Sequence, residues 1–203
     1  MVNKVFMGDE RLMLRRTVIG AGVAAGAPVR VVWARSLWRT LLDSRSLAGW
    51  SPTGDANWSL REGVVQADAG TGFLVSDETF GDVEIRAEFW VSEDANSGIF
   101  IRCTNPLRID PTSAYEVNIY DRRPDPTYGT GAIVGVAKVS PMPKAGGRWN
   151  VMEILAKGDR FTVTLNGVRT VDNVQDASHA HGRIALQHGE GLVRFRKVQV
   201  RPI

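Results

Sequence analysis

Residues 83–91 read VEIRAEFWV and alternate between two kinds of side chain along their whole length. The odd-numbered positions, from Val83 to Val91, are all apolar, and the even-numbered ones are charged apart from Trp90. Successive side chains of a β-strand point to opposite faces of its sheet, so this period of two predicts a strand. One face of the strand should be core and the other mostly solvated.

Strands of the same kind are predicted further along the chain. Residues 115–120 alternate again, which places Glu116 and Asn118 on the side opposite the apolar residues. Two more strands are predicted at residues 183–187 and 192–200. The alternation slips late in the second of these, which indicates a β-bulge.

The strongest hairpin signal is Asn166-Gly167, which separates the β-like runs 161–165 and 168–171. This dipeptide readily supplies the two positive φ values of a type I′ turn, so a tight hairpin is expected. Helical signals are sparse, and only residues 37–42 could form a short helical turn. Many short strands separated by turn residues predict an all-β sandwich or barrel, and a sandwich would leave one outer face free for a ligand.

Length and charge limit the other function classes. The 203 residues fit one domain, and the net charge of +3 comes entirely from residues 1–34, because the remainder carries equal numbers of basic and acidic residues. Without a basic stripe on the body, nucleic-acid binding has no electrostatic source. Cys103 is the single cysteine, so no intramolecular disulfide forms, and it is interpreted as a small buried apolar residue.

The N-terminal segment resembles an export signal. Arg15-Arg16 stands before an apolar run at residues 18–27, which is rich in Gly and Ala and too short for a permanent membrane span. Paired arginines before a mildly apolar run are typical of twin-arginine signals. Residues 1–34 are therefore predicted to be a signal and its flank, residues 35–203 a single domain, and the protein periplasmic or secreted. The alternative is an amphipathic or disordered cytosolic extension.

An ordered series of motifs runs from residue 47 to the C-terminus. The motifs are Leu47-Ala48-Gly49-Trp50, Trp58 with Glu62-Gly63-Val64-Val65, Asn96-Ser97-Gly98-Ile99-Phe100-Ile101-Arg102, Tyr115-Glu116-Val117-Asn118-Ile119, Thr130-Gly131-Ala132-Ile133, Trp149-Asn150, Leu165-Asn166-Gly167 and Ile184-Ala185-Leu186-Gln187-His188-Gly189. In this order they resemble the family of 3-keto-disaccharide hydrolase domains. The sequence departs from the family pattern at Asn118, where Gln is common, and at Val134, where a Tyr often stands nearby.

The resemblance implies a concanavalin A-like jelly roll of two antiparallel sheets, the concave one holding a sugar. It also implies cleavage of 3-keto-disaccharides or 3-keto-glycosides, by hydrolysis or by elimination. A ketone at C3 acidifies the hydrogen at C2, so elimination needs a base, a cation or donor for the enolate, and an acid for the leaving oxygen. We expect Glu116 to be the base, with Arg102 and His188 completing the catalytic set.

The substrate-binding candidates are polar residues near this set, namely Asn118, Asp121 and Gln187, together with Trp90 as a stacking residue on the polar side of its strand. Trp50, Trp58 and Trp149 are interpreted as packing residues. Two alternatives stay open for the polar residues and the domain. The strand faces could be solvated surfaces with ordinary ion pairs, and the domain could be a non-catalytic carbohydrate-binding module or an interaction module.

His179 and His181 have a spacing that would put both rings on one side of a strand, as in some metal sites. The segment reads as a loop, and exposed loop histidines are common, so no metal ligands are predicted there. A divalent cation held by Glu116, Asp121 or His188 would suit enolate chemistry.

Overall fold

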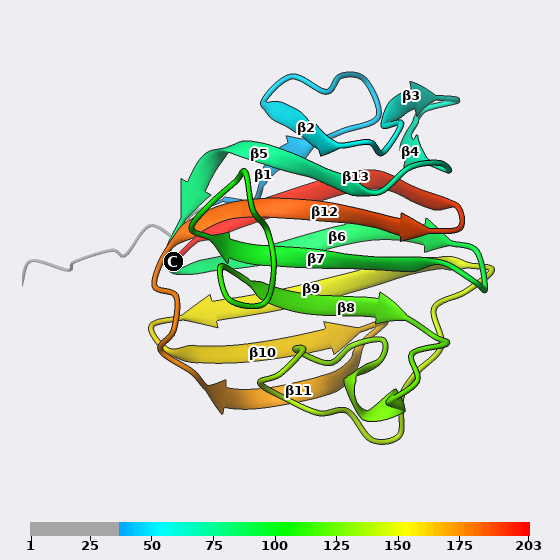
Figure 1. Cartoon of the computed structure of the whole chain (residues 1–203). Helices are drawn as coiled ribbons and strands as arrows, with labels where there is room; N and C mark the ends of the chain where they lie inside the picture. The colour runs from blue at the N-terminus through cyan, green and yellow to red at the C-terminus, as the bar shows by residue number, and fades with distance from the viewer. Residues whose placement is uncertain (1–36) are drawn as a thin grey trace, which may run out of the picture. The chain divides into compact units, whose positions relative to one another are not determined.

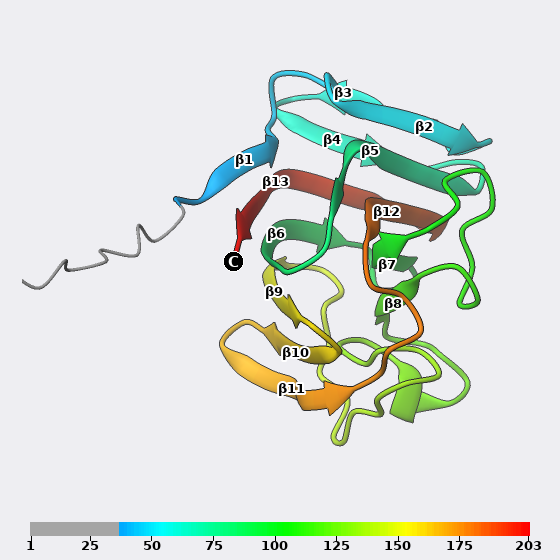
Figure 2. The same ribbon diagram turned by 90° about the vertical axis from the view of Figure 1, so that its left-hand side faces the viewer.

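The structure, a computed structural model, describes residues 37–203, which form two stacked antiparallel sheets (Figures 1 and 2). The eight-stranded sheet contains β1 (Arg39–Leu42), β3 (Ser59–Arg61), β4 (Val64–Ala67), β6 (Val83–Val91), β9 (Trp149–Lys157), β10 (Arg160–Leu165), β11 (Val168–Gln175) and β13 (Val193–Pro202). The five-stranded sheet contains β2 (Trp50–Gly54), β5 (Gly72–Phe80), β7 (Asn96–Cys103), β8 (Tyr115–Tyr120) and β12 (Gly182–Glu190). The predicted all-β sandwich is confirmed.

The strand order brings together segments that are far apart in the sequence. The larger sheet runs β11-β10-β9-β6-β13-β4-β3 with β1 also paired to β13, and the smaller sheet runs β2-β5-β12-β7-β8. The consecutive strands β5 and β6 belong to different sheets, so the chain crosses between layers there. The outward-facing residues of the smaller sheet therefore come from five separate parts of the sequence.

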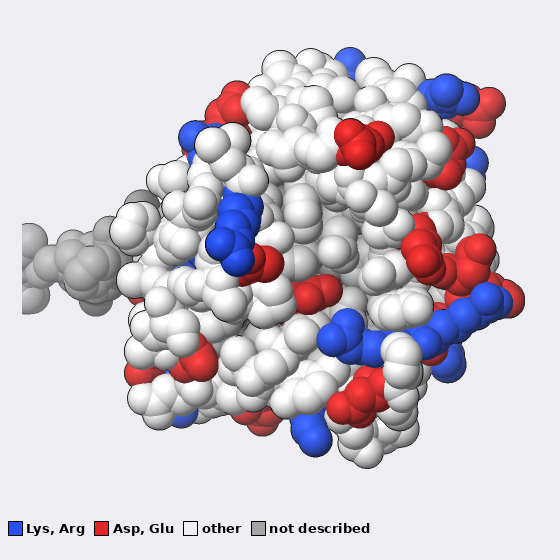
Figure 3. Space-filling view, in the orientation of Figure 1, with Lys and Arg blue, Asp and Glu red and all other residues white. Residues whose placement is uncertain are grey.

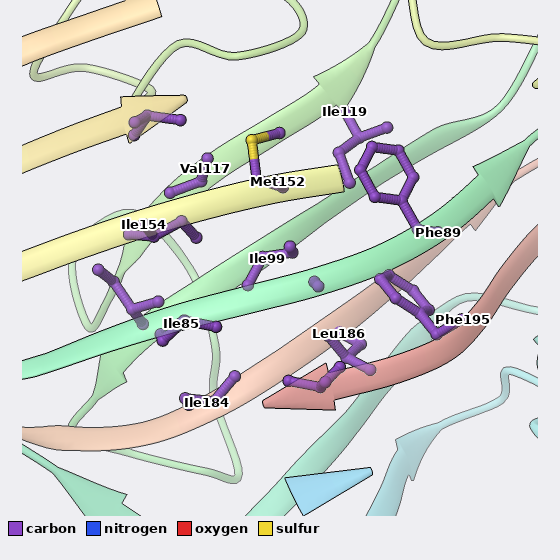
Figure 4. Close-up of a cluster of buried hydrophobic side chains, with 14 of the residues drawn as sticks. Ile85, Phe89, Ile99, Val117, Ile119, Met152, Ile154, Ile184, Leu186 and Phe195 are labelled. Atoms are coloured by element: carbon purple, nitrogen blue, oxygen red, sulfur yellow. The ribbon is translucent and has the colours of Figure 1, made fainter. Parts of the chain in front are cut away.

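The core lies between the two sheets and contains the apolar sides of the alternating strands. Ile85 and Phe89 of β6 face Ile99 of β7 and Leu186 of β12, as Figure 4 shows, and all four are fully buried. The alternation predicted for residues 83–91 is confirmed, because all five of the odd-numbered residues are buried. Burial of this apolar surface is the main stabilising contribution to the sandwich.

Local backbone geometry confirms two predictions and corrects a third. Asn166 and Gly167 have φ values of 51° and 81°, as a type I′ turn requires, and β13 has the expected bulge between Phe195 and Lys197. Residues 37–42, in contrast, contain no helical turn. Residues 39–42 are strand β1, because their backbone pairs with β13 and Leu42 packs into the core.

Two long loops border the outer face of the five-stranded sheet. Residues 104–114 connect β7 to β8, and residues 121–148 follow β8 and contain the short 3₁₀ helix η1 (Pro126–Tyr128). Figure 1 shows the first loop rising in front of β7 and β12. Across residues 37–203, no helix has the length and apolar character needed to cross a membrane. The predicted export signal at residues 1–34 lies outside the described residues and stays a prediction.

Candidate functional site

The outer face of the five-stranded sheet presents two neighbouring rows of side chains. Strand register aligns Phe73, Gln187, Gly98 and Asn118 across β5, β12, β7 and β8. The adjacent row aligns Val75, Ala185, Phe100 and Glu116 across the same strands. Alternation along each strand puts both rows on the same face, so Glu116 and Asn118 lie together as predicted from residues 115–120.

Gly98 is the one position in these rows without a side chain, and it opens a gap in the floor. A Cβ atom built there would lie 3.4 Å from Gln187 Oε1, 3.4 Å from Glu116 Cγ and 3.3 Å from Phe100 Cε2. The side chains of Gln187 and Glu116 therefore converge on one backbone point from opposite sides. Glycine in a strand interior often marks such a close approach by a ligand or another backbone.

Glu116 has the properties of a base that is ready to act. Its side chain is largely buried, with 8% of the residue exposed, and this burial raises the pKa of its carboxyl above the ordinary value. Among the described residues its carboxylate has no hydrogen bond or ion pair, although the positive charge of Arg123 lowers the pKa in part. A carboxylate with a raised pKa and free oxygens is a stronger base than an ordinary carboxylate.

Two amide oxygens flanking Gly98 are buried and have no hydrogen-bond partner among residues 37–203. Asn118 is fully buried and its Nδ2 donates to Tyr128 O over 2.7 Å, which orients the amide and leaves Oδ1 unpaired. Gln187 Oε1 is likewise buried and unpaired. Leaving a buried acceptor unpaired costs roughly 1–3 kcal/mol, so two of them in one row indicate a place where a ligand supplies donors.

A cleft of about 610 Å³ opens over this floor at its β5 and β12 side. Figure 3 shows the face hollowed near its centre, where the surface is mainly uncharged, with charged side chains around it. The residues lining the cleft are Thr53, Gly54, Thr71, Gly72, Phe73, Asn96, Pro106, Leu107, Arg108, Ile109, Gln187, His188, Gly189 and Glu190. Gln187 lines the cleft and also belongs to the row beside Glu116, so it is the residue that the two regions share.

The structure corrects the predicted position of Arg102. Alternation along β7 would put Arg102 on the face of Phe100, but its φ of 53° breaks the pattern and turns the side chain inward. The guanidinium donates to Gly158 O over 2.6 Å and to His179 O over 3.0 Å, and it lies 5.0 Å from the centre of the Phe161 ring in the core. Its charge is therefore neither free nor near Glu116.

The side chain of His188 also points away from the face that carries Glu116. Gln187 faces the cleft, so its neighbour on the strand faces the opposite way. Both ring nitrogens of His188 lie 2.8 Å from backbone oxygens, Nδ1 from Gly70 O and Nε2 from Gly191 O. The residue borders the cleft, but its ring is 2% exposed and packed edge-on against Trp58. The predicted acid is held as a structural residue.

Two predicted substrate-binding residues have structural contacts elsewhere. Trp90 lies on the outer face of the other sheet, opposite Trp149 and 5.3 Å from the Arg194 guanidinium carbon, so it cannot contact a ligand over Glu116. The carboxylate of Asp121 accepts hydrogen bonds from the backbone N–H groups of Ala145 and Gly146 and from the Thr130 hydroxyl. Asp121 therefore holds loop 121–148 in place.

The described residues contain no group of three or more His, Cys, Asp and Glu side chains that could hold a metal ion. Glu116, Asp121 and His188 are not brought together, and the ring of His179 packs against Tyr115. Cys103 is buried on the ligand side of the sheet, and its burial raises the pKa of the thiol to about 12, which keeps it protonated.

Sequence reasoning missed two residues of this face. Arg123 is half-buried, exerts its charge on Glu116, and has no hydrogen bond or ion pair within the part of the chain that the structure describes. Its position just after β8 was a usable signal, but nothing in the pair Arg122-Arg123 says which side chain turns inward. Phe73 packs edge-to-face on Phe100 at 5.1 Å, and the alternation of β5 could have identified it.

A family model and several solved structures match this chain. The family model described as a 3-keto-alpha-glucoside-1,2-lyase-like domain matches residues 37–201. None of the curated proteins matches the chain. Among solved structures, a candidate glycosyl hydrolase from Parabacteroides distasonis is 23% identical, with a TM-score of 0.68 and coverage of 82% of this chain and 100% of that one.

Two further solved structures share the architecture. The carbohydrate-binding module CBM66 from Bacillus subtilis is 17% identical, with a TM-score of 0.55 over 83% of this chain and 97% of its own. The β-glucanase of Bacillus licheniformis is 12% identical, with a TM-score of 0.56 over 84% of this chain and 100% of its own. At these identities the likeness shows the fold alone, and it confirms the predicted jelly roll.

Proposed function

Because the chain belongs to the family of 3-keto-alpha-glucoside-1,2-lyase-like domains, we propose that it cleaves 3-keto-glycosides with Glu116 as the base. The observation that carries this proposal is the partnerless, buried carboxylate of Glu116 beside the two unpaired amide oxygens that flank Gly98. A fold alone does not determine a function, so the argument rests on these groups and not on the jelly roll.

The proposed reaction starts with transfer of the C2 proton of the sugar to Glu116. The C–H electron pair forms a C2=C3 double bond, and the C3 oxygen takes the negative charge. The enolate then re-forms the ketone, a C1=C2 double bond appears, and the C1–O bond breaks with its electrons on the leaving oxygen. That oxygen takes a proton from Glu116 or from water, and addition of water across C1=C2 gives the free 3-keto sugar.

The surrounding residues supply the remaining interactions in this proposal. Arg123 takes the role first predicted for Arg102, since its guanidinium is the charge that acts on Glu116 and is free to stabilise the enolate oxygen. Asn118 Oδ1 and Gln187 Oε1 accept hydrogen bonds from sugar hydroxyls, which satisfies both buried acceptors on binding.

The test is to incubate the protein with 3-ketomaltose and follow release of glucose. Glu116→Gln keeps the size of the side chain and removes the base, so kcat should fall by about 10²-fold or more, because general-base catalysis contributes about 10²–10⁴-fold. The matched control is Glu153→Gln on the outer face of the other sheet, where Glu153 binds Arg86. Full activity in Glu116→Gln would remove Glu116 from the mechanism.

The second candidate is a non-catalytic carbohydrate-binding module, and the unpaired oxygens of Asn118 and Gln187 favour it specifically. They can accept hydrogen bonds from sugar hydroxyls whether or not Glu116 takes a proton from the sugar. Calorimetric titration with maltose separates the two candidates. Saturable binding with no turnover of any 3-keto-glycoside would support the module and exclude the enzyme.

We propose also that residues 1–34 direct export to the periplasm or the cell exterior, on the strength of Arg15-Arg16 and the apolar run that follows. Fusion of this segment to a reporter that is active only after export provides the test. Replacing both arginines by lysine should retain the reporter inside the cell. Equal export of the two fusions would exclude the twin-arginine route.

A further inference from the structure

The loop formed by residues 104–113 holds its shape through hydrogen bonds within itself. Asn105 Oδ1 accepts from Leu107 N over 3.0 Å, and the Ser113 hydroxyl donates to Arg108 O over 2.7 Å. Asp110 closes the turn by accepting from the Arg108 guanidinium at 3.0 Å. These hydrogen bonds, together with the packing of Ile109 against the outer side of the sheet, define the conformation of the loop.

The tip of this loop carries a leucine that is almost wholly exposed. Leu107 is 90% exposed, and its neighbours Pro106 and Ile109 line the cleft with it. A single exposed leucine on a surface is ordinary. This one lies with Pro106 and Ile109 at the edge of an open cleft that Phe73 also lines.

The cleft is too large for the reacting sugar alone. Its volume of about 610 Å³ lies in the range of roughly 300–1,000 Å³ that pockets for drug-sized ligands have. Across the sheet Gln187 lies between Phe73 and Gly98, so a sugar with its C2 hydrogen at Glu116 and its C1 directed toward β5 would place its C1 substituent beside Phe73 and Leu107. The cleft is thus positioned for the leaving group.

Resting on the proposed function, we infer that Phe73, Leu107 and Ile109 form a leaving-group subsite for an aromatic aglycone. An aromatic ring can pack flat or edge-on against Phe73 and bury the exposed Leu107, contacts that a hydroxyl-rich second sugar would use less well. An aromatic aglycone also suits the residues present, because a phenolate is a weak base and can leave with little help from an acid. His188 and Asp121, the residues that could have helped, are engaged in structural hydrogen bonds.

Turnover tests the inference through leaving-group preference. The wild type should show a higher kcat/KM for 4-nitrophenyl 3-keto-α-glucoside than for methyl 3-keto-α-glucoside or 3-ketomaltose. Leu107→Ser should raise KM for the nitrophenyl substrate about tenfold, as expected for loss of a few apolar carbons from a pocket, with kcat nearly unchanged. KM for the methyl substrate should stay constant. Leu60→Ser on β3 is the control, since Leu60 is an exposed leucine of the other sheet.

A binding measurement that needs no turnover separates this inference from the proposed function. Titration with 4-nitrophenyl α-glucoside, which has no ketone, should give tighter binding than methyl α-glucoside or maltose, and Leu107→Ser should weaken it about tenfold. If no 3-keto-glycoside is cleaved but this dependence holds, the proposed reaction fails and the aromatic subsite stands. Tighter binding of maltose, or a Leu107→Ser variant that binds all three equally well, overturns the subsite.

Discussion

The two outer faces of the sandwich differ in how their carboxylates are paired. On the eight-stranded sheet Glu153 binds Arg86, Glu84 binds Arg201 and Glu88 binds Arg196. On the five-stranded sheet Glu116 has no partner among the described residues, and Asn118 and Gln187 each bury an unpaired oxygen.

The pairing of the carboxylates is the feature on which the proposed site rests. Polar groups that are already paired gain little from a ligand. A buried acceptor without a hydrogen bond has a free-energy cost in the free protein, and a ligand can remove that cost. The same contrast applies to the aromatic residues. Trp149 lies under Arg196 at 4.4 Å, whereas Phe73 packs edge-to-face on Phe100.

The largest effect is expected from closing the gap at Gly98. Gly98→Ala places a methyl group 3.3–3.4 Å from Gln187, Phe100 and Glu116, so it should displace the sugar and the base together. A misplacement of about 1 Å can cost 10²-fold, and we expect a loss of that order in kcat/KM. Gly81→Ala is the control because its nearest neighbour lies 3.7 Å away. Equal activities in the two variants would mean that no ligand approaches Gly98.

A smaller effect is expected from removing the charge beside Glu116. Arg123→Gln should lower kcat about tenfold by withdrawing stabilisation of the enolate. Since Arg123 lowers the pKa of Glu116, its removal raises that pKa further, and Glu116 must be deprotonated to act. The acidic limb of the pH profile of kcat/KM should therefore move to higher pH. Arg122→Gln, at the exposed neighbour, should leave the limb in place.

Because Gln187 Oε1 is unpaired, we expect a substitution there to raise the stability of the protein and to lower its affinity for sugar. Gln187→Met removes a buried acceptor without a partner and keeps a side chain of similar length. The free energy of unfolding should rise by about 1 kcal/mol, while affinity for maltose falls. Urea denaturation and calorimetric titration of one sample measure both quantities. A loss of stability would show that Gln187 Oε1 is satisfied in the free protein.

The smallest effect is expected on the paired face. Arg86→Gln breaks an exposed ion pair with Glu153, for which a change of about 0.2–1 kcal/mol in the free energy of unfolding is typical. Its activity on 3-ketomaltose should equal that of the wild type. A large loss of activity here would contradict the assignment of the two faces.

Local pattern was enough for one part of the site and insufficient for another. The alternation of residues 115–120 correctly placed Glu116 and Asn118 on one face, because the period of two depends only on the strand itself. The alternation of β7 gave the wrong face for Arg102, because one positive φ reverses the direction of the side chain. For His188 the same alternation would have given the right answer. Because Gln187 faces outward, its neighbour His188 is expected to face inward.

Other parts of the site depended on long-range pairing. Trp90 is on the polar side of its strand as predicted, but β6 belongs to the sheet that faces away from the site. Alternation assigns a residue to a face without saying which sheet the face belongs to. Arg123 reaches Glu116 only because loop 121–148 folds back after β8, held by Asp121.

The sequence by itself determined strands such as 83–91 and 115–120, the hairpin at Asn166-Gly167, and the presence of a carboxylate and an amide on one face of β8, since these depend on residues within a few positions of one another. The tertiary structure alone decided that Gln187 and Gly98 would join that row, that Arg123 and not Arg102 would supply the charge, and that Leu107 would border the cleft. The physical reason is that sheet order and loop closure bring together segments almost a hundred residues apart, and no local period encodes such pairings.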